Sequence, residues 1–285
     1  MPHTNRKKKT PAGMKSVTDQ NRKQIIVHTK RKEVLDDEGW THVVDKPSRQ
    51  RASSVTESKD AGKYWSIGAD FKVGDAYYIN RTIEEIQEEF THSKKAWEGS
   101  PACASLKALL DEKMKADSNT KKISRVVALG LGSLQSSRTQ SRKTSFTQMA
   151  ALETILQIMA KEETISMIFQ DPVFTDLDKE FLVTLGHQVV EDPAAFDQID
   201  ENTLVYAIHC YSDVYQKVSQ APKPAVLVST DVELFDRTSL DGEKGDVKSL
   251  GAMVESYEAI PFPQIRHDFS DTKIYWPKNV ESGNP

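Results

Sequence analysis

After Ser124 the chain alternates between short continuous apolar runs and longer segments in which apolar residues recur every three or four positions. The continuous runs predict strands at residues 125–129, 165–169, 187–190, 203–208, 225–228 and 272–276. The periodic segments predict helices at 144–160, at 175–186, after an N-cap at Ser212, and at 247–257. Strands that are apolar on both faces and alternate with helices are typical of a parallel sheet covered on both sides. We therefore expect a Rossmann-like, doubly wound α/β fold with a mostly parallel sheet.

Local signals support two of the helix boundaries. Thr175 and Asp178 form a Thr-x-x-Asp variant of the capping box, and Gly186 is the expected C′ residue of the same helix. Between Thr82 and Met114 the apolar spacing is helical, with Gly99-Ser100-Pro101 as a break between two helices. We expect residues 61–120 to form a helical extension that packs on an α/β domain at residues 121–285.

The first 60 residues differ in composition from the rest. Residues 1–32 carry a net charge of +9, which leaves −13 on the remainder of the chain. Because large apolar groups are few, we expect residues 1–60 to be a disordered basic tail. Residues 39–44 (Gly-Trp-Thr-His-Val-Val) are the exception and suit a short extended docking segment. Residues 5–9 are either a nuclear-import signal or a solvated basic stretch.

Charge and cysteine content narrow the partners and the compartment. An acidic body makes nucleic acid an unfavourable partner for the α/β domain, so only the basic tail is a candidate for contact with nucleic acid. The tail could also contact protein partners. The two cysteines, Cys103 and Cys210, lack the spacing of a disulfide framework or of a structural zinc site, and we predict no metal site. With no long apolar run and no secretory signal, we expect a protein of the cytoplasm, the nucleus or both, with no membrane partner.

Polar residues follow four of the predicted strands at the point where each ends. Ligands of open parallel sheets bind beyond the carboxyl ends of the strands, so these residues are the candidate ligand-binding site. They are Gly130, Gly132 and Ser133 after the first strand, Asp171 after the second, His209 and Cys210 after the 203–208 strand, and Ser229 with Asp231 after the next. We expect one contiguous pocket at the carboxyl edge of the sheet, lined by Gly130, Gly132, Ser133, Asp171 and His209.

The glycine turn does not identify a cofactor. Gln135 stands where a dinucleotide fingerprint needs a third glycine, Ala128 stands where a methyltransferase motif needs an acid, and no Gly-Lys-Ser/Thr occurs. Residues 134–143, rich in hydroxyl groups and cations, are a phosphate cradle, a kinase target or a plain surface loop. The cofactor is therefore unknown.

Each remaining candidate also has a structural interpretation. Asp171 could bind ribose hydroxyls, but it precedes Pro172 and could equally form a turn. His209 and Cys210 are adjacent, and adjacent strand residues point to opposite faces, so they cannot act as a simple Cys-His dyad. His209 is the stronger candidate for contact with a ligand.

Several short motifs occur together in a fixed order. The sequence Gly130-Leu131-Gly132-Ser133, then Gln148, Asp171-Pro172-Val173-Phe174-Thr175, Leu185-Gly186 and His209-Cys210 resembles the SRR-like (sensitivity to red light reduced) domain family. The segment 39–44 resembles the Gly-Trp-Thr-x-Val segment that often precedes that domain. Ala207-Ile208 and Val228-Ser229-Thr230 depart from the Met-Pro and Gly-Asn-Ser that the family often has there, which puts a shared ligand chemistry on that side in doubt.

The resemblance implies a regulatory role, since family members are implicated in light and circadian signalling, gene expression and haem metabolism without an established reaction. Our first hypothesis is a regulatory protein that senses a small anionic or nucleotide-like ligand. The alternative is a transferase acting on a nucleotide-like substrate, with His209 as general base and Asp171 and the glycines positioning the ligand. The third hypothesis is a scaffold protein with a vestigial pocket that binds no ligand.

Overall fold

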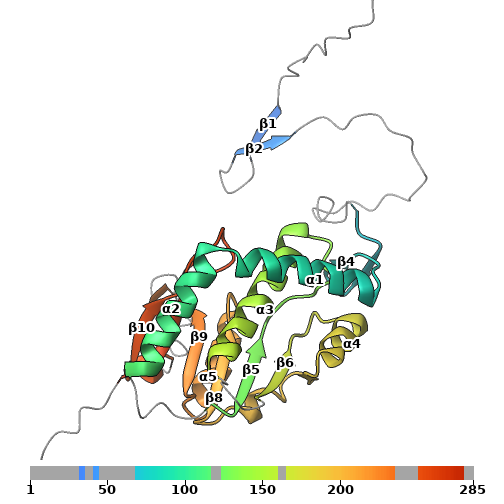
Figure 1. Ribbon diagram of the computed structural model, residues 1–285. Helices are drawn as coiled ribbons and strands as arrows, with labels where there is room; N and C mark the ends of the chain where they lie inside the picture. The colour runs from blue at the N-terminus through green and yellow to red at the C-terminus, as the bar shows by residue number, and fades with distance from the viewer. Residues whose placement is uncertain are drawn as a thin grey trace, which may run out of the picture. The chain divides into compact units, whose positions relative to one another are not determined.

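The computed structural model describes residues 32–35, 41–44, 68–116, 123–159, 165–234 and 250–278 (Figure 1). The chain divides into two compact units, residues 1–59 and 60–285. In the first unit the described residues are two antiparallel strands, β1 (Lys32–Leu35) and β2 (Thr41–Val44). Part of the predicted docking segment is thus strand β2, and β1 is a strand within the predicted disordered tail, whereas Trp40 and the rest of that tail lie outside the described residues.

The second unit is built on a seven-stranded mixed sheet with the order β10-β11-β9-β8-β5-β6-β7. Its strands are β5 (Arg125–Leu129), β6 (Ser166–Gln170), β7 (Gln188–Val189), β8 (Thr203–Ala207), β9 (Val226–Thr230), β10 (Tyr257–Pro261) and β11 (Thr272–Pro277). Five strands, from β7 to β9, are parallel, and β11 and β10 add antiparallel at one edge. The predicted α/β fold is confirmed.

The direction of strand addition reverses between β5 and β8. The chain starts in the middle of the sheet at β5, adds β6 and β7 on one side, and returns to add β8 and β9 on the other. In a doubly wound sheet such a reversal leaves a crevice at the carboxyl ends of the two strands, because the connections leave them in opposite directions. The turns after Leu129 and Ala207 therefore face one another.

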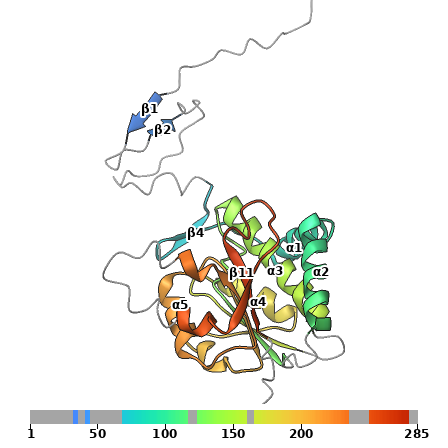
Figure 2. The same ribbon diagram turned by 90° about the vertical axis from the view of Figure 1, so that its left-hand side faces the viewer.

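Helices cover both faces of this sheet (Figures 1 and 2). They are α1 (Ile83–Glu98), α2 (Pro101–Ala116), α3 (Thr139–Met159), α4 (Asp176–Thr184) and α5 (Ser212–Gln220), with a short 3₁₀ helix at Phe196–Gln198. In β5, Val126 and Ala128 belong to the core under α1, α2 and α3, whereas Val127 and Leu129 belong to the core under α5. Two buried faces explain why the strand sequences are continuously apolar.

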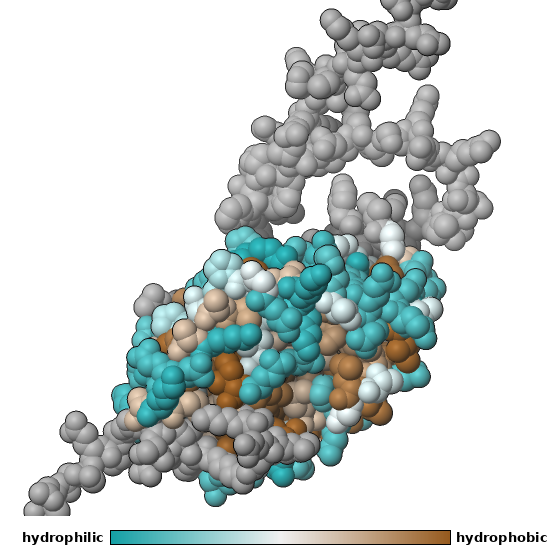
Figure 3. Space-filling model, viewed as in Figure 1, coloured by the Kyte–Doolittle hydropathy of each residue, from teal (hydrophilic) through white to brown (hydrophobic). Residues whose placement is uncertain are grey.

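The two helices α1 and α2 pack against α3. Thr82 caps α1 through a capping box with Glu85, and Gly99 ends the helix before Pro101 begins α2, as the sequence predicts. Trp97 is 1% exposed and donates a hydrogen bond from Nε1 to Thr154 in α3. Figure 3 shows mainly hydrophilic residues on the outer surface of α1.

Three local predictions need correction, and one hairpin was not predicted. Helix α3 begins at Thr139 rather than Thr144, because the apolar face that guided the prediction starts one turn inside the helix. Tyr211, not Ser212, is the N-cap of α5, and no side chain caps it. Of the predicted 247–257 helix, residues 250–254 are helical and Tyr257 begins β10. The hairpin of β3 (Phe71–Val73) and β4 (Ala76–Tyr78) was not predicted.

Among the helices in the described part of the chain, none is both long enough and apolar enough to cross a membrane.

Candidate functional site

The turn after β5 requires both of its glycines. Gly130 and Gly132 have φ values of 68° and 81°, which lie in a backbone region that residues other than glycine rarely adopt. A Cβ atom on Gly130 would lie 2.5 Å from Sγ of Cys210, and one on Gly132 would lie 2.8 Å from Oγ of Ser145. The turn therefore passes directly under the end of β8 and under α3.

Asp171 holds this turn in place from the end of β6. Its Oδ2 accepts the Gly132 N–H at 2.7 Å, and its Oδ1 accepts the Val173 N–H at 2.9 Å. Burial raises the pKa of Asp171, and these two N–H groups oppose the rise. Both carboxylate oxygens thus have partners within the chain, which supports the turn-forming interpretation.

Ser133 points into the protein rather than toward an open edge. It is 3% exposed, its Oγ accepts the Gln135 N–H at 3.0 Å, and its hydroxyl hydrogen-bonds to Asp178. Asp178 also accepts the N–H groups of Leu134 and Thr175, so it joins the glycine turn to the start of α4. Burial raises the pKa of Asp178, and these hydrogen bonds oppose the rise.

Most main-chain donors of the loop between β5 and α3 are used internally. The N–H groups that donate within the chain are those of Gly130, Gly132, Leu134, Gln135, Ser136, Ser137 and Arg138. Leu131 and Ser133 are the two residues of this described loop whose N–H groups have no acceptor in the chain. The loop is therefore not an open cradle of the kind that encloses a triphosphate, since all but two of its N–H groups already have acceptors in the chain.

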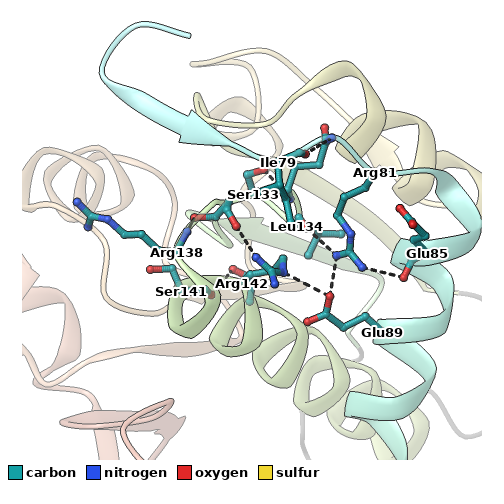
Figure 4. Close-up of polar contacts among 12 residues, drawn as sticks. Ile79, Arg81, Glu85, Glu89, Ser133, Leu134, Arg138, Ser141 and Arg142 are labelled. Atoms are coloured by element: carbon teal, nitrogen blue, oxygen red, sulfur yellow. Dashed lines mark hydrogen bonds and ion pairs between the residues drawn. The ribbon is translucent and has the colours of Figure 1, made fainter. Parts of the chain in front are cut away.

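A charged clamp fixes the outer part of the same loop (Figure 4). Arg81 donates from Nη1 to the Leu134 carbonyl and pairs with Glu89 at 2.7 Å. Arg142 donates to the Ser136 carbonyl at 2.7 Å and pairs with Glu89 at 3.3 Å. Sequence reasoning missed this clamp, because Arg81 precedes α1 and contacts a loop about 50 residues later in the chain.

His209 lies on the side of β8 that faces β9. Its φ of 53° is unusual for a residue other than glycine, and its N–H donates to Thr230 Oγ1 at 2.9 Å. Its ring Nε2 is 2.7 Å from the Ser270 carbonyl. A carbonyl oxygen only accepts, so Nε2 is the donor in this contact, and in the neutral form of the ring Nδ1 is then the acceptor. The side chain is exposed.

The structure therefore separates the predicted site residues into two groups. One group surrounds the glycine turn and consists of Gly130, Gly132, Ser133, Asp171 and Cys210. His209 instead contacts Thr230 and Ser270, and the buried Ser229 donates its hydroxyl to the Thr230 carbonyl. Asp231 forms an ion pair with Lys273 at 2.8 Å.

Cys210 is a protonated thiol in this setting. Burial, followed by the negative charge of Asp171, raises the pKa of Cys210 to about 12. Its Sγ lies 3.4 Å from the Leu129 carbonyl, on the opposite side from the contacts of His209. The thiol therefore has little nucleophilic character at neutral pH, in agreement with the prediction that the pair is no dyad.

Tyr215 in α5 organises the ends of β8 and β9, and sequence reasoning missed it. Its hydroxyl donates to the Ala207 carbonyl at 2.8 Å, accepts the Cys210 N–H at 3.2 Å, and lies 3.0 Å from Thr230 Oγ1. The apolar spacing of Tyr215 and Val218 indicates only a core position. Tyr215 is nevertheless 2% exposed, and its hydroxyl, bonded to both strand ends, sets the shape of the His209-Cys210 turn.

Gln148 connects α3 to the segment that contacts His209. Its Nε2 donates to the Asp268 carbonyl at 2.9 Å, and Thr144 donates to the Asp268 carboxylate at 2.7 Å. Arg266 pairs with the same carboxylate at 2.6 Å. This network around the buried Asp268 fixes residues 266–270, and with them the Ser270 carbonyl that contacts the His209 ring.

The site offers hydrogen-bonding groups rather than metal ligands. Within the described ranges, no group of three or more His, Cys, Asp or Glu residues could hold a metal ion. Two pockets, of about 400 and about 450 Å³, lie beside β10 and β11 and beside the start of α1. Neither pocket is lined by the predicted site residues.

Comparisons with known proteins identify one family. A family model described as the SRR1 domain matches residues 85–276, which include most of α1 and all of α2. The solved structure titled "Crystal structure of cofactor-bound Rv0187 from MTB" is 12% identical, with 68% of this chain and 89% of that chain covered at a TM-score of 0.33. That similarity is too low to support an argument about fold or ligand. A search of curated proteins finds no match.

Proposed function

Because the chain belongs to the SRR1 domain family, we propose that it is a regulatory protein that binds a small anionic or nucleotide-like ligand at the carboxyl ends of β5 and β8. The observation that carries the proposal is the reversal of strand addition at this point. There the turn through Gly130 meets the turn through His209, and both have positive φ. Unfavourable backbone conformations concentrate at binding and catalytic sites, where surrounding contacts hold them.

The available donors favour an anionic group of limited size. The N–H groups of Leu131 and Ser133 are unused within the chain, and the first turn of α3 holds no acidic residue. Arg138 and Lys143 are exposed at the same helix start, where the helix dipole adds partial positive charge. One phosphate or carboxylate suits this number of donors better than a triphosphate does.

The regulatory part of the proposal rests on the family and on the chemistry of the site. Cys210 is protonated and Asp171 is occupied by two N–H groups, so neither is a ready nucleophile or base. We further propose that the basic residues before position 60 contact protein partners and that the protein acts in the cytoplasm, the nucleus or both.

One observation favours the alternative, a transferase with His209 as general base. With Nε2 donating to the Ser270 carbonyl, Nδ1 of the neutral ring is an acceptor, and the side chain is exposed. A neutral imidazole held in this way can take a proton from a substrate hydroxyl.

Binding and turnover measurements on two histidine variants distinguish the regulatory proposal from the transferase alternative. Calorimetry and thermal shift would measure binding by three proteins: the wild type, His209→Ala and His92→Ala. The probes are nucleoside mono- and diphosphates, dinucleotides and inorganic phosphate. His92 is also exposed, but it lies on α1. Binding without product, weakened in His209→Ala alone, supports the regulatory proposal. Turnover that His209→Ala loses while it still binds supports the transferase, and no binding by any probe contradicts both.

A further inference from the structure

Two serines near the start of α3 have an arginine three residues earlier. Ser141 follows Arg138, and Ser145 follows Arg142. Ser141 is exposed in the first turn of the helix, whereas Ser145 is 3% exposed and donates its hydroxyl to the Ser141 carbonyl at 3.1 Å. Within α3, the same sequence pattern thus places one serine at the surface and one in the interior.

We propose that Ser141 is a phosphorylation site for a protein kinase that selects an arginine three residues before its target. Kinases of this class distinguish substrates by charge, through acidic groups that pair with the arginine. Arg138 is exposed, and Figure 4 shows Arg138 and Ser141 directed away from the Arg81-Glu89-Arg142 clamp. Arg142 is held inside that clamp by Glu89 and by the Ser136 carbonyl.

The reaction is an ordinary phosphoryl transfer from ATP. The Oγ atom of Ser141 attacks the γ-phosphorus, the bond to the β–γ bridging oxygen breaks, and ADP leaves. The hydroxyl proton passes to the catalytic base of the kinase. A phosphoserine of about −2 charge then stands in the first turn of α3, which has no acid of its own and where the helix dipole favours negative charge.

The phosphate would also act on the candidate ligand site, and this part rests on the proposed function. Ser145, which is hydrogen-bonded to Ser141, has its Oγ 2.8 Å from where a Cβ on Gly132 would stand. A phosphate on Ser141 therefore lies about one helical turn from the glycine turn. Its charge would repel an anionic ligand there, so modification would lower ligand affinity.

The test is site mapping by mass spectrometry after the full chain is incubated with an arginine-directed kinase and ATP. We expect phosphate on Ser141. Arg138→Ala should reduce its rate at least about tenfold, the loss expected when one charge-assisted hydrogen bond to the kinase is removed. Lys143→Ala, which removes an equal charge from the same helix start, should leave the rate unchanged. Ser212, exposed in the first turn of α5 but preceded at that spacing by His209, should stay unmodified.

The unfolded chain provides the internal control. Ser145 should be modified only after denaturation, because only then does its hydroxyl reach a kinase. Phosphorylated protein should melt roughly 1–3 °C higher at low salt, with a smaller gain at high salt. Modification of Ser145 in the folded protein in place of Ser141, or equal rates for wild type and Arg138→Ala, would overturn the proposal. The mapping needs no ligand, so its failure is distinct from failure of the ligand proposal.

Discussion

The Sγ atom of Cys210 lies 2.5 Å from the point where a Cβ atom on Gly130 would stand. The end of β8 thus packs on the turn after β5 so closely that the turn has no room for a side chain. Because Gly130 also has a φ of 68°, two independent constraints select glycine at the position where strand addition reverses.

Replacing Gly130 with alanine should therefore destabilise the protein through both constraints. The left-handed backbone costs about 1–2 kcal/mol for a residue with a Cβ, and the overlap with Cys210 adds roughly 1–3 kcal/mol. Urea unfolding of Gly130→Ala, Cys210→Ala and the double variant measures the coupling between the two residues. In the double variant, the stability lost through overlap with Cys210 should be regained, whereas the stability lost through the left-handed backbone should not. Strict additivity would show that the thiol does not limit this position.

Loss of the Tyr215 hydroxyl should loosen the His209-Cys210 turn. Tyr215→Phe keeps the ring but leaves the Cys210 N–H and the Ala207 carbonyl without this partner, so we expect a loss of about 1–3 kcal/mol in the free energy of unfolding. Tyr211→Phe is the matched control, because Tyr211 is 86% exposed and should change stability little. Hydrogen exchange at Cys210 should accelerate in Tyr215→Phe alone. Equal exchange rates at Cys210 in the two variants would show that the Tyr215 hydroxyl does not stabilise the His209-Cys210 turn.

The raised pKa of Asp171 gives a pH dependence of known sign. Between the ordinary value of 3.8 and its raised value, the folded protein binds more protons at Asp171 than the unfolded chain does. The free energy of unfolding of the wild type, relative to Asp171→Asn, should therefore fall as pH rises through this interval and then level off. Asp200, whose pKa is lowered, is the control. Relative to Asp200→Asn, the wild type should lose stability only as pH falls below about 4. A rising curve for Asp171 would contradict its desolvation.

Cys210 should resist alkylation at alkaline pH. With a pKa raised to about 12, little thiolate forms near pH 9, whereas an ordinary thiol is then largely ionised. Iodoacetamide labelling of the folded protein, read by peptide mapping at Cys210, should stay slow near pH 9 and become fast after denaturation. Rapid labelling of the folded protein would show that the thiol is ionised and would restore it as a nucleophile candidate.

The strands and most helices could be predicted because both faces of the central sheet are buried. Burial on two sides makes β5, β6, β8 and β9 continuously apolar, and the Thr175 capping box marks α4 directly. Strand β10 was missed because only two of its five residues, Tyr257 and Ile260, are buried, so its pattern resembles a helix. The start of α3 was missed because its first turns are polar.

The glycine turn and Asp171 were predicted to come together because they follow neighbouring parallel strands. The placement of His209 toward Thr230 and Ser270 was not predictable, since it depends on the direction of one side chain after the end of β8 and on a loop about 60 residues later. The Tyr215 hydroxyl and the Arg81-Glu89-Arg142 clamp were hidden for the same reason. Polar contacts between distant segments leave no periodic signal in a sequence.

The most direct test of the ligand site compares two glycines with the same backbone conformation. Gly132 and Gly186 have φ values of 81° and 83°, but only Gly132 lies at the carboxyl end of β5, and the space around Gly186 is open. The wild type, Gly132→Ala and Gly186→Ala are purified in the same way and incubated with the phosphate or nucleotide probe that binds best to the wild type. Native mass spectrometry then measures the fraction of each protein that carries a bound small molecule. The account predicts a bound small molecule in the wild type and in Gly186→Ala, and its loss in Gly132→Ala. Equal occupancy in the two alanine variants, or none in the wild type, would contradict it.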